Sequence, residues 1–463
     1  MNKMHKISII LILLILTSCK SNPKEEYAII KGNITNGEDI EKIYLTNNDR
    51  DFKYEINLLE DGSFRDTLTI EPGMYSMSIE SRKSTQIVFS KGDDLTIIMD
   101  ANYFKDSLKF EGQGSNENIL LQTINKKIID WEQKKSEAYS LGEGDYKNLL
   151  SERQKELTAL LYGKQELNPL FVDFMKRHID YWKFYGLTYY QVYHRYYTKN
   201  PEFTISSDFL DGARALDFYR EVDYKASEYY YRLVMSEQIK RADSIEKSGV
   251  SNKTLARLKA SAGFQSDYIK NDLLLQTIMG SLAFDNEFTS SFDAYMQLST
   301  NPDHKAKVLK QFNEVKSLEK GNLSPKFVNY ENYNGGLSSL DDFKGKYVYI
   351  DVWATWCGPC KAEIPYLQDV EKTYHDNDKI AFVSISVDKE KDHEKWKAMV
   401  KDKEMSGYQL IADNSFKSDF IDSYKVKGIP QFILIDPNGN IVNRSAPRPS
   451  SPRLIELLND LDI

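Results

Sequence analysis

The sequence contains little cysteine. Only three of its 463 residues are cysteines, namely Cys19, Cys357 and Cys360, which is too few for a disulfide framework across a chain of this length. Hydrophobic residues make up 41% of the chain and aromatic residues 12%, which is typical of globular domains. Since one domain takes about 100–200 residues, we expect a multidomain protein whose cores are stabilised by burial and not by cross-links.

Positive charge is outnumbered by negative charge, and histidine is scarce. The chain has 61 Lys and Arg against 69 Asp and Glu, a net charge of -8, which argues against a nucleic-acid partner. The six histidines include no pair at ligand spacing, so no metal site is expected. No Gly-rich phosphate loop follows a strand, and no Gly-x-Ser-x-Gly motif occurs. We therefore expect no cofactor, and a protein or a small molecule as the partner.

No apolar run is long enough to span a membrane. The run Ile7–Leu16 follows Lys3 and Lys6 and covers about half of the 20 residues that a transmembrane helix needs. This pattern predicts a signal peptide over residues 1–18. The four residues that end at Cys19 resemble a bacterial lipobox, which implies cleavage before this cysteine and acylation of its sulfur and its new amine. The alternative is an unmodified cysteine within the signal peptide.

The lipobox also predicts where the protein resides. Residues 19–26 would form a lipidated tether, and several acyl chains would anchor the protein to a membrane. The body would then lie in the cell envelope and face the periplasm. Lys20 favours the outer membrane by the enterobacterial sorting rule, but that rule does not extend to all bacteria. The choice between the inner and the outer membrane stays open.

Two regions follow the tether. Residues 27–112 contain short β-type runs separated by turn pairs such as Asn36-Gly37, which predicts an all-β sandwich or barrel. In residues 113–323 apolar residues recur at helical intervals, and Asn168-Pro169 is a helix-start signal, which predicts a helical region. The β-rich region has neither a nucleophile–base pair nor a metal spacing, so a spacer or docking module is the simplest interpretation.

Tyrosine is concentrated in one stretch of the helical region. Tyr181, Tyr185, Tyr189 and Tyr193 would lie on one face of a helix because they recur every four residues. An aromatic packing seam explains this pattern most simply. The alternative is the wall of a protein-binding groove, since tyrosine combines a large apolar area with a hydrogen-bonding tip.

The last third of the chain, residues 324–463, carries the residues suited to chemistry. The apolar run Lys346–Trp353 predicts a central strand, and a helical pattern begins shortly after it. Between them, Cys357 would lie at the helix N-terminus, where free N–H groups and the helix dipole favour a thiolate. Cys360 would lie one turn further on, within reach of the first sulfur.

The motif Trp353–Cys360 resembles the active site of thioredoxin. Its continuation through Pro365 resembles the membrane-tethered extracytoplasmic thioredoxins of the TlpA/ResA type. Val383–Asp388 and Lys427–Asp436 support this resemblance, which covers residues 325–463. The β-rich region resembles a domain of unknown function that precedes thioredoxin-like domains in bacterial lipoproteins. The resemblance implies a C-terminal α/β thioredoxin-like fold and a membrane-anchored thiol-disulfide oxidoreductase.

The resemblance also implies roles for four residues. Cys357 would attack a substrate disulfide, and Cys360 would resolve the mixed disulfide. Two acids match proton acceptors of the family: Asp351 matches the buried acid of cytoplasmic thioredoxins, and Glu363 matches the acid of the TlpA/ResA type. We prefer Asp351 as the base because it lies on the strand expected to be buried. Glu363 could instead be a solvated charge on the helix face.

A second group of residues would contact the substrate. Its expected members are Trp356, Gly358, Pro359, Ile429 and Pro430. In the family, the proline that matches Pro430 is cis and faces the cysteines, so the backbone of Ile429 would pair with an extended substrate segment. Trp356 is either a cover for the active site or a core residue, and we favour the cover.

The direction of electron flow is open. The dipeptide Gly358-Pro359 is that of reducing thioredoxins, so we expect reduction of extracytoplasmic protein disulfides with electrons from a membrane donor. A disulfide oxidase or isomerase is the alternative. Peroxiredoxins share the fold, but their single peroxidatic cysteine does not match this motif. A ligand-binding envelope lipoprotein with an accessory redox domain is a further possibility.

Overall fold

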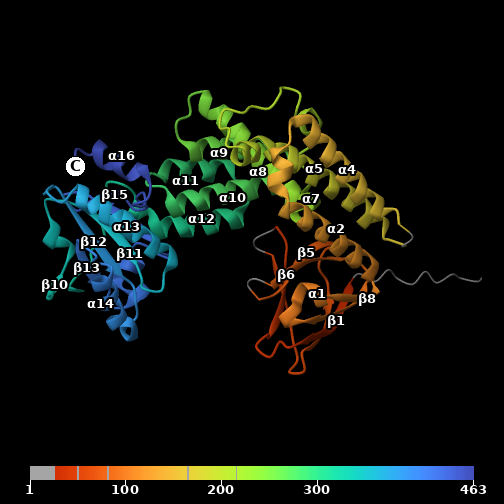
Figure 1. Cartoon of the computed structure of the whole chain (residues 1–463), viewed down its shortest axis with the longest axis horizontal. Coiled ribbons are helices and arrows are strands. Elements are labelled where there is room, and N and C mark those ends of the chain that lie inside the picture. Colours follow the sequence, from red (N-terminus) through yellow and green to blue (C-terminus); the bar gives the residue numbers. More distant parts are fainter. Residues whose placement is uncertain (1–26, 49–51, 81–82, 164–165, 215) are drawn as a thin grey trace, which may run out of the picture. The chain divides into compact units, whose positions relative to one another are not determined.

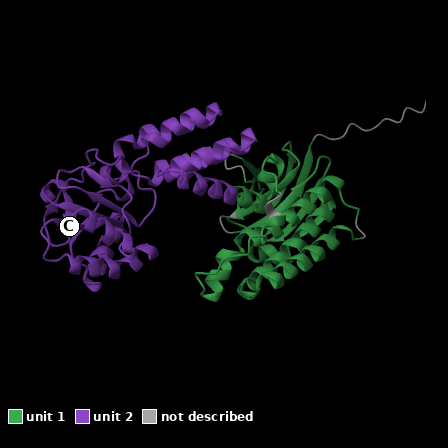
Figure 2. Ribbon diagram, turned by 90° about the horizontal axis from the view of Figure 1, so that it is seen from above, with its two compact units in different colours: residues 1–234 green, residues 235–463 purple. Residues whose placement is uncertain are grey.

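The computed structural model describes most of the chain; the described residues are 27–48, 52–80, 83–163, 166–214 and 216–463. The predicted signal peptide, the tether and Cys19 lie outside them. Within these ranges, no helix combines the length and the apolar character needed to cross a membrane. The chain divides into two compact units, residues 1–234 and 235–463 (Figure 2). The domain limits expected near residues 112 and 323 stay predictions.

The first unit begins with two four-stranded sheets. Their strands are β1 (Ala28–Thr35), β2 (Lys42–Thr46), β3 (Lys53–Asn57), β4 (Ser63–Leu68), β5 (Gly73–Glu80), β6 (Lys83–Phe89), β7 (Asp94–Asp100) and β8 (Lys109–Gln113). The sheet orders are β4-β1-β7-β8 and β3-β2-β5-β6. Alternating side chains of both sheets, such as Ile30 and Leu45, are fully buried in one shared core. The predicted all-β architecture is confirmed, and of the two forms expected it is the sandwich.

Helices complete the first unit (Figure 1). They are α1 (Phe104–Ser107), α2 (Ser115–Gln133), α3 (Lys135–Ser140), α4 (Glu143–Leu161), α5 (Pro169–Thr198), α6 (Asp211–Arg214), α7 (Glu221–Ala226) and α8 (Glu228–Lys247), which contains the boundary between the units. Helix α5 begins as the sequence predicts, because Asn168 is its N-cap and accepts a hydrogen bond from the N–H of Leu170. The helical middle region is confirmed.

The tyrosines of α5 are largely packed against other rings. Tyr181 is 4% exposed, and its ring centroid lies 4.7 Å from that of Tyr230 on α8. The centroid of Tyr193 lies 4.7 Å from that of Tyr139 on α3. These contacts favour the interpretation of the tyrosine-rich face as a packing seam.

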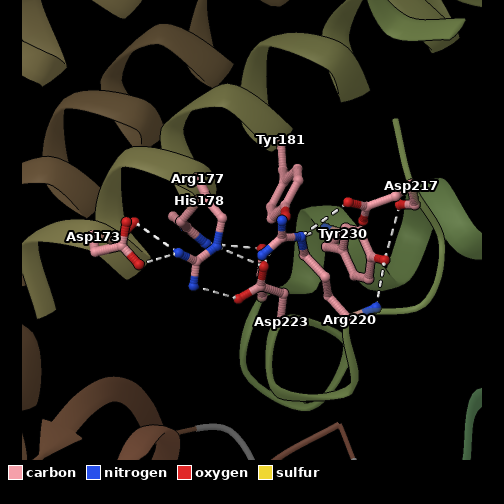
Figure 3. A network of polar contacts seen from close by, with 9 residues as sticks. Asp173, Arg177, His178, Tyr181, Asp217, Arg220, Asp223 and Tyr230 are labelled. Carbon is pink, nitrogen blue, oxygen red and sulfur yellow. Dashed lines mark hydrogen bonds and ion pairs between the residues drawn. The ribbon is translucent and has the colours of Figure 1, made fainter. Parts of the chain in front are cut away.

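A buried ion pair joins α5 to α7 (Figure 3). Asp223 is only 1% exposed, and it accepts hydrogen bonds from the Arg177 guanidinium at 2.8 Å and from the Tyr181 hydroxyl at 2.7 Å. Next to this pair, His178 lies 2.9 Å from the Ser227 hydroxyl. Complete burial lowers the pKa of His178 to about 4, so the imidazole is neutral at pH 7. Ser227 is fully buried and His178 only 1% exposed, so the contact between these two residues is closed to a substrate.

The second unit combines four helices with a mixed α/β domain. Its first helices are α9 (Lys253–Ala262), α10 (Asp267–Phe284), α11 (Thr289–Leu298) and α12 (Pro302–Val315). A seven-stranded sheet follows in the order β10-β9-β13-β12-β11-β14-β15. Its strands are β9 (Tyr330–Asn332), β10 (Leu337–Ser338), β11 (Tyr347–Trp353), β12 (Ile380–Ser386), β13 (Tyr408–Ile411), β14 (Gln431–Ile435) and β15 (Ile441–Asn443). Strands β11, β12 and β13 are parallel, and β14 is antiparallel to β11.

Helices cover both faces of this sheet (Figure 1). Helices α13 (Gly358–Thr373) and α16 (Pro452–Asp460) pack on the face that carries Tyr349 and Phe432. Helix α14 (His393–Asp402) packs on the opposite face through Trp396. Helix α15 (Asp419–Ser423) precedes β14. This arrangement confirms the thioredoxin-like α/β fold predicted for the last third.

Arg444 joins the helices α9–α12 to the sheet domain. It follows β15 directly and is 5% exposed. Its guanidinium donates hydrogen bonds to the carbonyl oxygens of Leu282 at 2.6 Å and Asp285 at 2.8 Å, at the C-terminus of α10. It also lies 4.7 Å from the ring centroid of Phe288. A cation at the negative end of a helix dipole is stabilising, so the four helices and the sheet belong to one unit.

Candidate redox site

The two cysteines lie where the central strand passes into a helix. Strand β11 is buried from Val348 to Trp353, and α13 begins five residues later. Cys357 is the N-cap residue of α13, and its sulfur accepts a hydrogen bond from the N–H of Cys360 at 3.1 Å. A disulfide joins the two residues. Because the first N–H groups of a helix have no partner within it, this position stabilises negative charge on the Cys357 sulfur when the bond is reduced.

A buried aspartate holds the turn that leads to the cysteines. Asp388 is 1% exposed, and its carboxylate accepts hydrogen bonds from the N–H of Thr355 at 2.9 Å and from the hydroxyl of Thr355 at 2.8 Å. The hydroxyl of Ser386 donates a third bond at 2.7 Å. The sequence analysis did not assign a role to Asp388. The available signal was its place just after a strand parallel to β11, because such strands end at the same edge of the sheet.

The segment before β14 faces the sulfurs. The Ile429–Pro430 peptide bond is cis, as the family resemblance implies. The carbonyl oxygen of Ile429 lies 3.8 Å from the sulfur of Cys357. Pro430 carries no N–H, so this segment offers backbone acceptors near the disulfide.

The remaining expected contact residues lie at the surface. The side chain of Trp356 is 59% exposed, and its ring centroid lies 6.4 Å from that of Phe416. Gly358 and Pro359 are also exposed, whereas Cys357 is only 4% exposed and Cys360 only 2%. The structure therefore brings the expected contact residues together around a nearly covered disulfide, and Trp356 is not a core residue.

Asp351 lies on β11, on the face of the sheet that α13 covers. It is 5% exposed, and one of its carboxylate oxygens has no hydrogen-bond partner among the described residues. Burial, with smaller contributions from the charges of Glu371 and Glu363, raises the pKa of Asp351 to about 8. A carboxyl group with such a pKa exchanges protons near neutral pH, which suits a general base or acid.

Glu363 is buried on α13 and not solvated. It is 6% exposed, and its carboxylate accepts hydrogen bonds from the N–H and the hydroxyl of Ser450, both at 2.9 Å. The Arg448 guanidinium lies 3.5 Å from the same carboxylate. Sequence reasoning could not identify these two partners, because they lie more than 80 residues away and belong to no recognisable motif. Glu363 is therefore held in a polar setting that differs from that of Asp351.

Comparison with known proteins places this site in context. The AhpC/TSA family model matches residues 321–444. The thiol-disulfide oxidoreductase ResA of Bacillus subtilis is 32% identical over 127 residues, 27% of this chain and 66% of its own. The thioredoxin-like protein YneN of the same organism is 31% identical over 27% of this chain and 69% of its own. The match thus spans about two thirds of the length of these relatives.

Solved structures match about a third of the chain. A putative thiol-disulfide oxidoreductase from Bacteroides vulgatus is 34% identical and covers 31% of this chain and 97% of its own, with a TM-score of 0.28.

Proposed function

Because the chain belongs to the thioredoxin-like thiol-disulfide oxidoreductases, we propose that it exchanges disulfides with proteins outside the cytoplasm, in the reducing direction. The observation that carries the proposal is the Cys357–Cys360 pair at the N-terminus of α13, with the carbonyl of Ile429 beside the first sulfur. The relatives named as thiol-disulfide oxidoreductases support it.

Exchange proceeds in two steps. The thiolate of Cys357 attacks one sulfur of a substrate disulfide, which forms a mixed disulfide and releases the other substrate sulfur as a thiolate. Cys360 then loses its proton and attacks the Cys357 sulfur. The Cys357–Cys360 disulfide forms, and the second substrate sulfur leaves. The substrate gains two electrons and, from Cys360 and the solvent, two protons.

The second step requires a base, because Cys360 is covered. Asp351 fills this role in the proposal, since its raised pKa lets it accept a proton near neutral pH. Glu363 is the other candidate, but its carboxylate is occupied by Ser450 and Arg448. The exposed residues Trp356, Gly358 and Pro359 would contact the substrate protein, and the backbone of Ile429 would pair with an extended segment of it.

The cellular setting is part of the proposal. The apolar run before the lipobox supports a lipid anchor at Cys19, which would hold the redox site in the envelope. A membrane protein would then return the Cys357–Cys360 pair to the dithiol, since each turnover leaves it oxidised.

The direction of exchange follows from the redox potential. The Gly358-Pro359 dipeptide supports a potential near the roughly -270 mV of thioredoxin. The redox potential is measured by equilibrating the protein with glutathione or dithiothreitol buffers. The thiols are then alkylated and counted by mass spectrometry. A value near the roughly -120 mV of strong oxidants would instead make the protein a disulfide oxidase.

A turnover assay tests the activity itself. The reduced protein should accelerate the reduction of insulin by dithiothreitol, and Cys357→Ser should abolish the acceleration. Equal rates with the native protein and with Cys357→Ser would refute the proposed activity.

A further inference from the structure

A row of polar side chains crosses the sheet beneath α13. Asp351 on β11 is paired in register with Ser384 on β12, which is paired with Gln409 on β13. These strands are parallel, so residues in register point to the same face. Their exposed fractions are 5%, 1% and 2%. Polar residues so deeply buried are costly unless they are partnered, so the row calls for a physical explanation.

Glu371 lies at the far end of this row. It is on the buried face of α13, two turns after Glu363, and is 8% exposed. The hydroxyl of Ser406 donates a hydrogen bond to its carboxylate, and the carbonyl of Ser406 accepts one from the amide of Gln409 at 2.6 Å. Gly407 leaves space for the carboxylate, since an added Cβ there would lie 2.7 Å from Glu371 Oε1.

Three oxygens of this group have no hydrogen-bond donor among the described residues. They belong to Asp351, Gln409 and Glu371, and all three are buried. A protonated carboxyl carries its own O–H, whereas two carboxylates would leave one buried oxygen on each acid without a donor. The arrangement therefore favours a state in which the two acids are not both ionised.

We propose that Asp351 and Glu371 form one coupled pair of buried acids, in which the charge on Glu371 sets the pH at which Asp351 can take the proton of Cys360. This inference rests on the proposed function. Glu371 is then a positioning residue, because it acts on the sulfur chemistry only through Asp351. The proton moves from the Cys360 thiol to the Asp351 carboxylate while the Cys360 sulfur attacks Cys357.

The other groups near Asp351 do not take over this role. Glu363 on α13 also acts on it, but Arg448 and Ser450 hold that carboxylate. Tyr349 on β11 stays neutral, because burial raises the pKa of its hydroxyl well above the usual value. Within the described part of the chain, Glu371 has no cationic partner, so its charge is not neutralised locally.

The pKa values of Glu371 and Asp351 agree with this geometry. Burial raises the pKa of Glu371 to about 6, although the hydrogen bond from Ser406 lowers it. The pKa of Asp351 is higher, at about 8. As the pH rises, Glu371 ionises first, and its negative charge then holds the proton on Asp351.

Ellman's reagent tests the inference with the full-length protein. Attack by reduced Cys357 releases one thionitrobenzoate and leaves the other on its sulfur; attack by Cys360 then releases the second. The rate of the second release is measured against pH. Glu371→Gln, which keeps the shape and can keep the Ser406 bond, should move the pH midpoint down by roughly one unit. Asp369→Asn, on the exposed face of the same helix, should leave it unchanged.

Two further variants show whether Glu371 acts through Asp351. Ser406→Ala should move the midpoint in the same direction, because Glu371 without its hydrogen bond keeps its proton to a higher pH. In an Asp351→Asn background, Glu371→Gln should cause no shift. An unmoved midpoint in Glu371→Gln and Ser406→Ala, or a full shift that persists without Asp351, would overturn the inference. Absence of the first release would instead refute the proposed thiol exchange.

Discussion

Among single residues, Asp351 couples stability to pH across the neutral and acidic range. Its pKa of about 8 in the folded protein compares with 3.8 for the ordinary side chain. Between these values, unfolding releases a proton, so the unfolded state binds fewer protons and stability falls as the pH rises. Glu371, with a pKa of about 6 against 4.5, acts in the same direction over a narrower range.

We predict that Asp351→Asn flattens this pH dependence. The native protein should lose up to about 1.4 kcal/mol of stability per pH unit from this group between roughly pH 4 and pH 8. The variant should lack that contribution and be the more stable form at pH 7. Urea unfolding at several pH values, with both proteins oxidised, measures the difference. Parallel curves for the two proteins would contradict the raised pKa.

A second prediction at this scale concerns Asp388. Asp388→Ala removes the acceptor for three hydrogen bonds and leaves the buried donors of Thr355 and Ser386 without partners. The expected loss is about 2–4 kcal/mol of unfolding free energy, together with slower alkylation of reduced Cys357. Asp388→Asn keeps one acceptor oxygen and should lose less. Urea unfolding and timed alkylation measure both effects; an alanine variant as stable as the native protein would show that the turn does not depend on Asp388.

The residues of the site were predictable to different degrees. The sequence placed Cys357 at a helix N-terminus and Asp351 on a buried strand because both features follow from local patterns of apolar residues. It did not identify the bonds from Thr355 to Asp388 or from Ser450 to Glu363. These bonds join residues that are 33 and 87 positions apart in the sequence. Local sequence patterns do not show which residues meet at such separations.

At the scale of elements, local signals predicted the ends of helices well. Asn168-Pro169 marks the start of α5, and the cysteine motif marks the start of α13. The short β-type runs predicted in residues 27–112 correspond to the described strands β1–β8. The hydrogen bonds from Arg444 to the C-terminus of α10 were not predicted, because an arginine in a loop is ordinarily solvated.

We predict that Arg444→Ala loosens the C-terminus of α10. The variant loses charge-assisted hydrogen bonds to the carbonyls of Leu282 and Asp285 and the contact with Phe288. The expected cost is about 2–4 kcal/mol. Hydrogen exchange in the last turn of α10 and urea unfolding measure the effect.

The matched control is Arg453→Ala, which removes an exposed arginine from α16. This variant should change neither the exchange rates in α10 nor the unfolding midpoint. If the two arginine variants behave alike, the guanidinium of Arg444 does not join α10 to the sheet domain.

At the scale of the whole molecule, the sequence predicted the order of architectures. A β-sandwich, a helical region and an α/β domain follow one another as the periodicities indicate. The division at residues 234 and 235 was not foreseen, because it falls within α8. Periodicity identifies helices, but it does not tell which of them pack together.

The proposed lipid anchor gives a prediction for the whole chain. Cys19→Ser should move the protein from the membrane fraction to the soluble fraction, because acyl chains at this residue are its expected membrane attachment. Fractionation followed by mass spectrometry of the native form measures this. Retention of Cys19→Ser in the membrane, with no acyl mass on the native protein, would rule out the anchor.

Trapping of substrates tests the central claim most directly. Cys360→Ser leaves Cys357 able to attack but removes the residue that resolves the mixed disulfide, so envelope proteins should stay joined to it. The two serine variants are expressed in parallel, and their adducts are compared on non-reducing gels. We expect reductant-sensitive adducts with Cys360→Ser and none with Cys357→Ser. Adducts with Cys357→Ser alone would reverse the order of attack, and their absence from both would contradict thiol exchange with proteins.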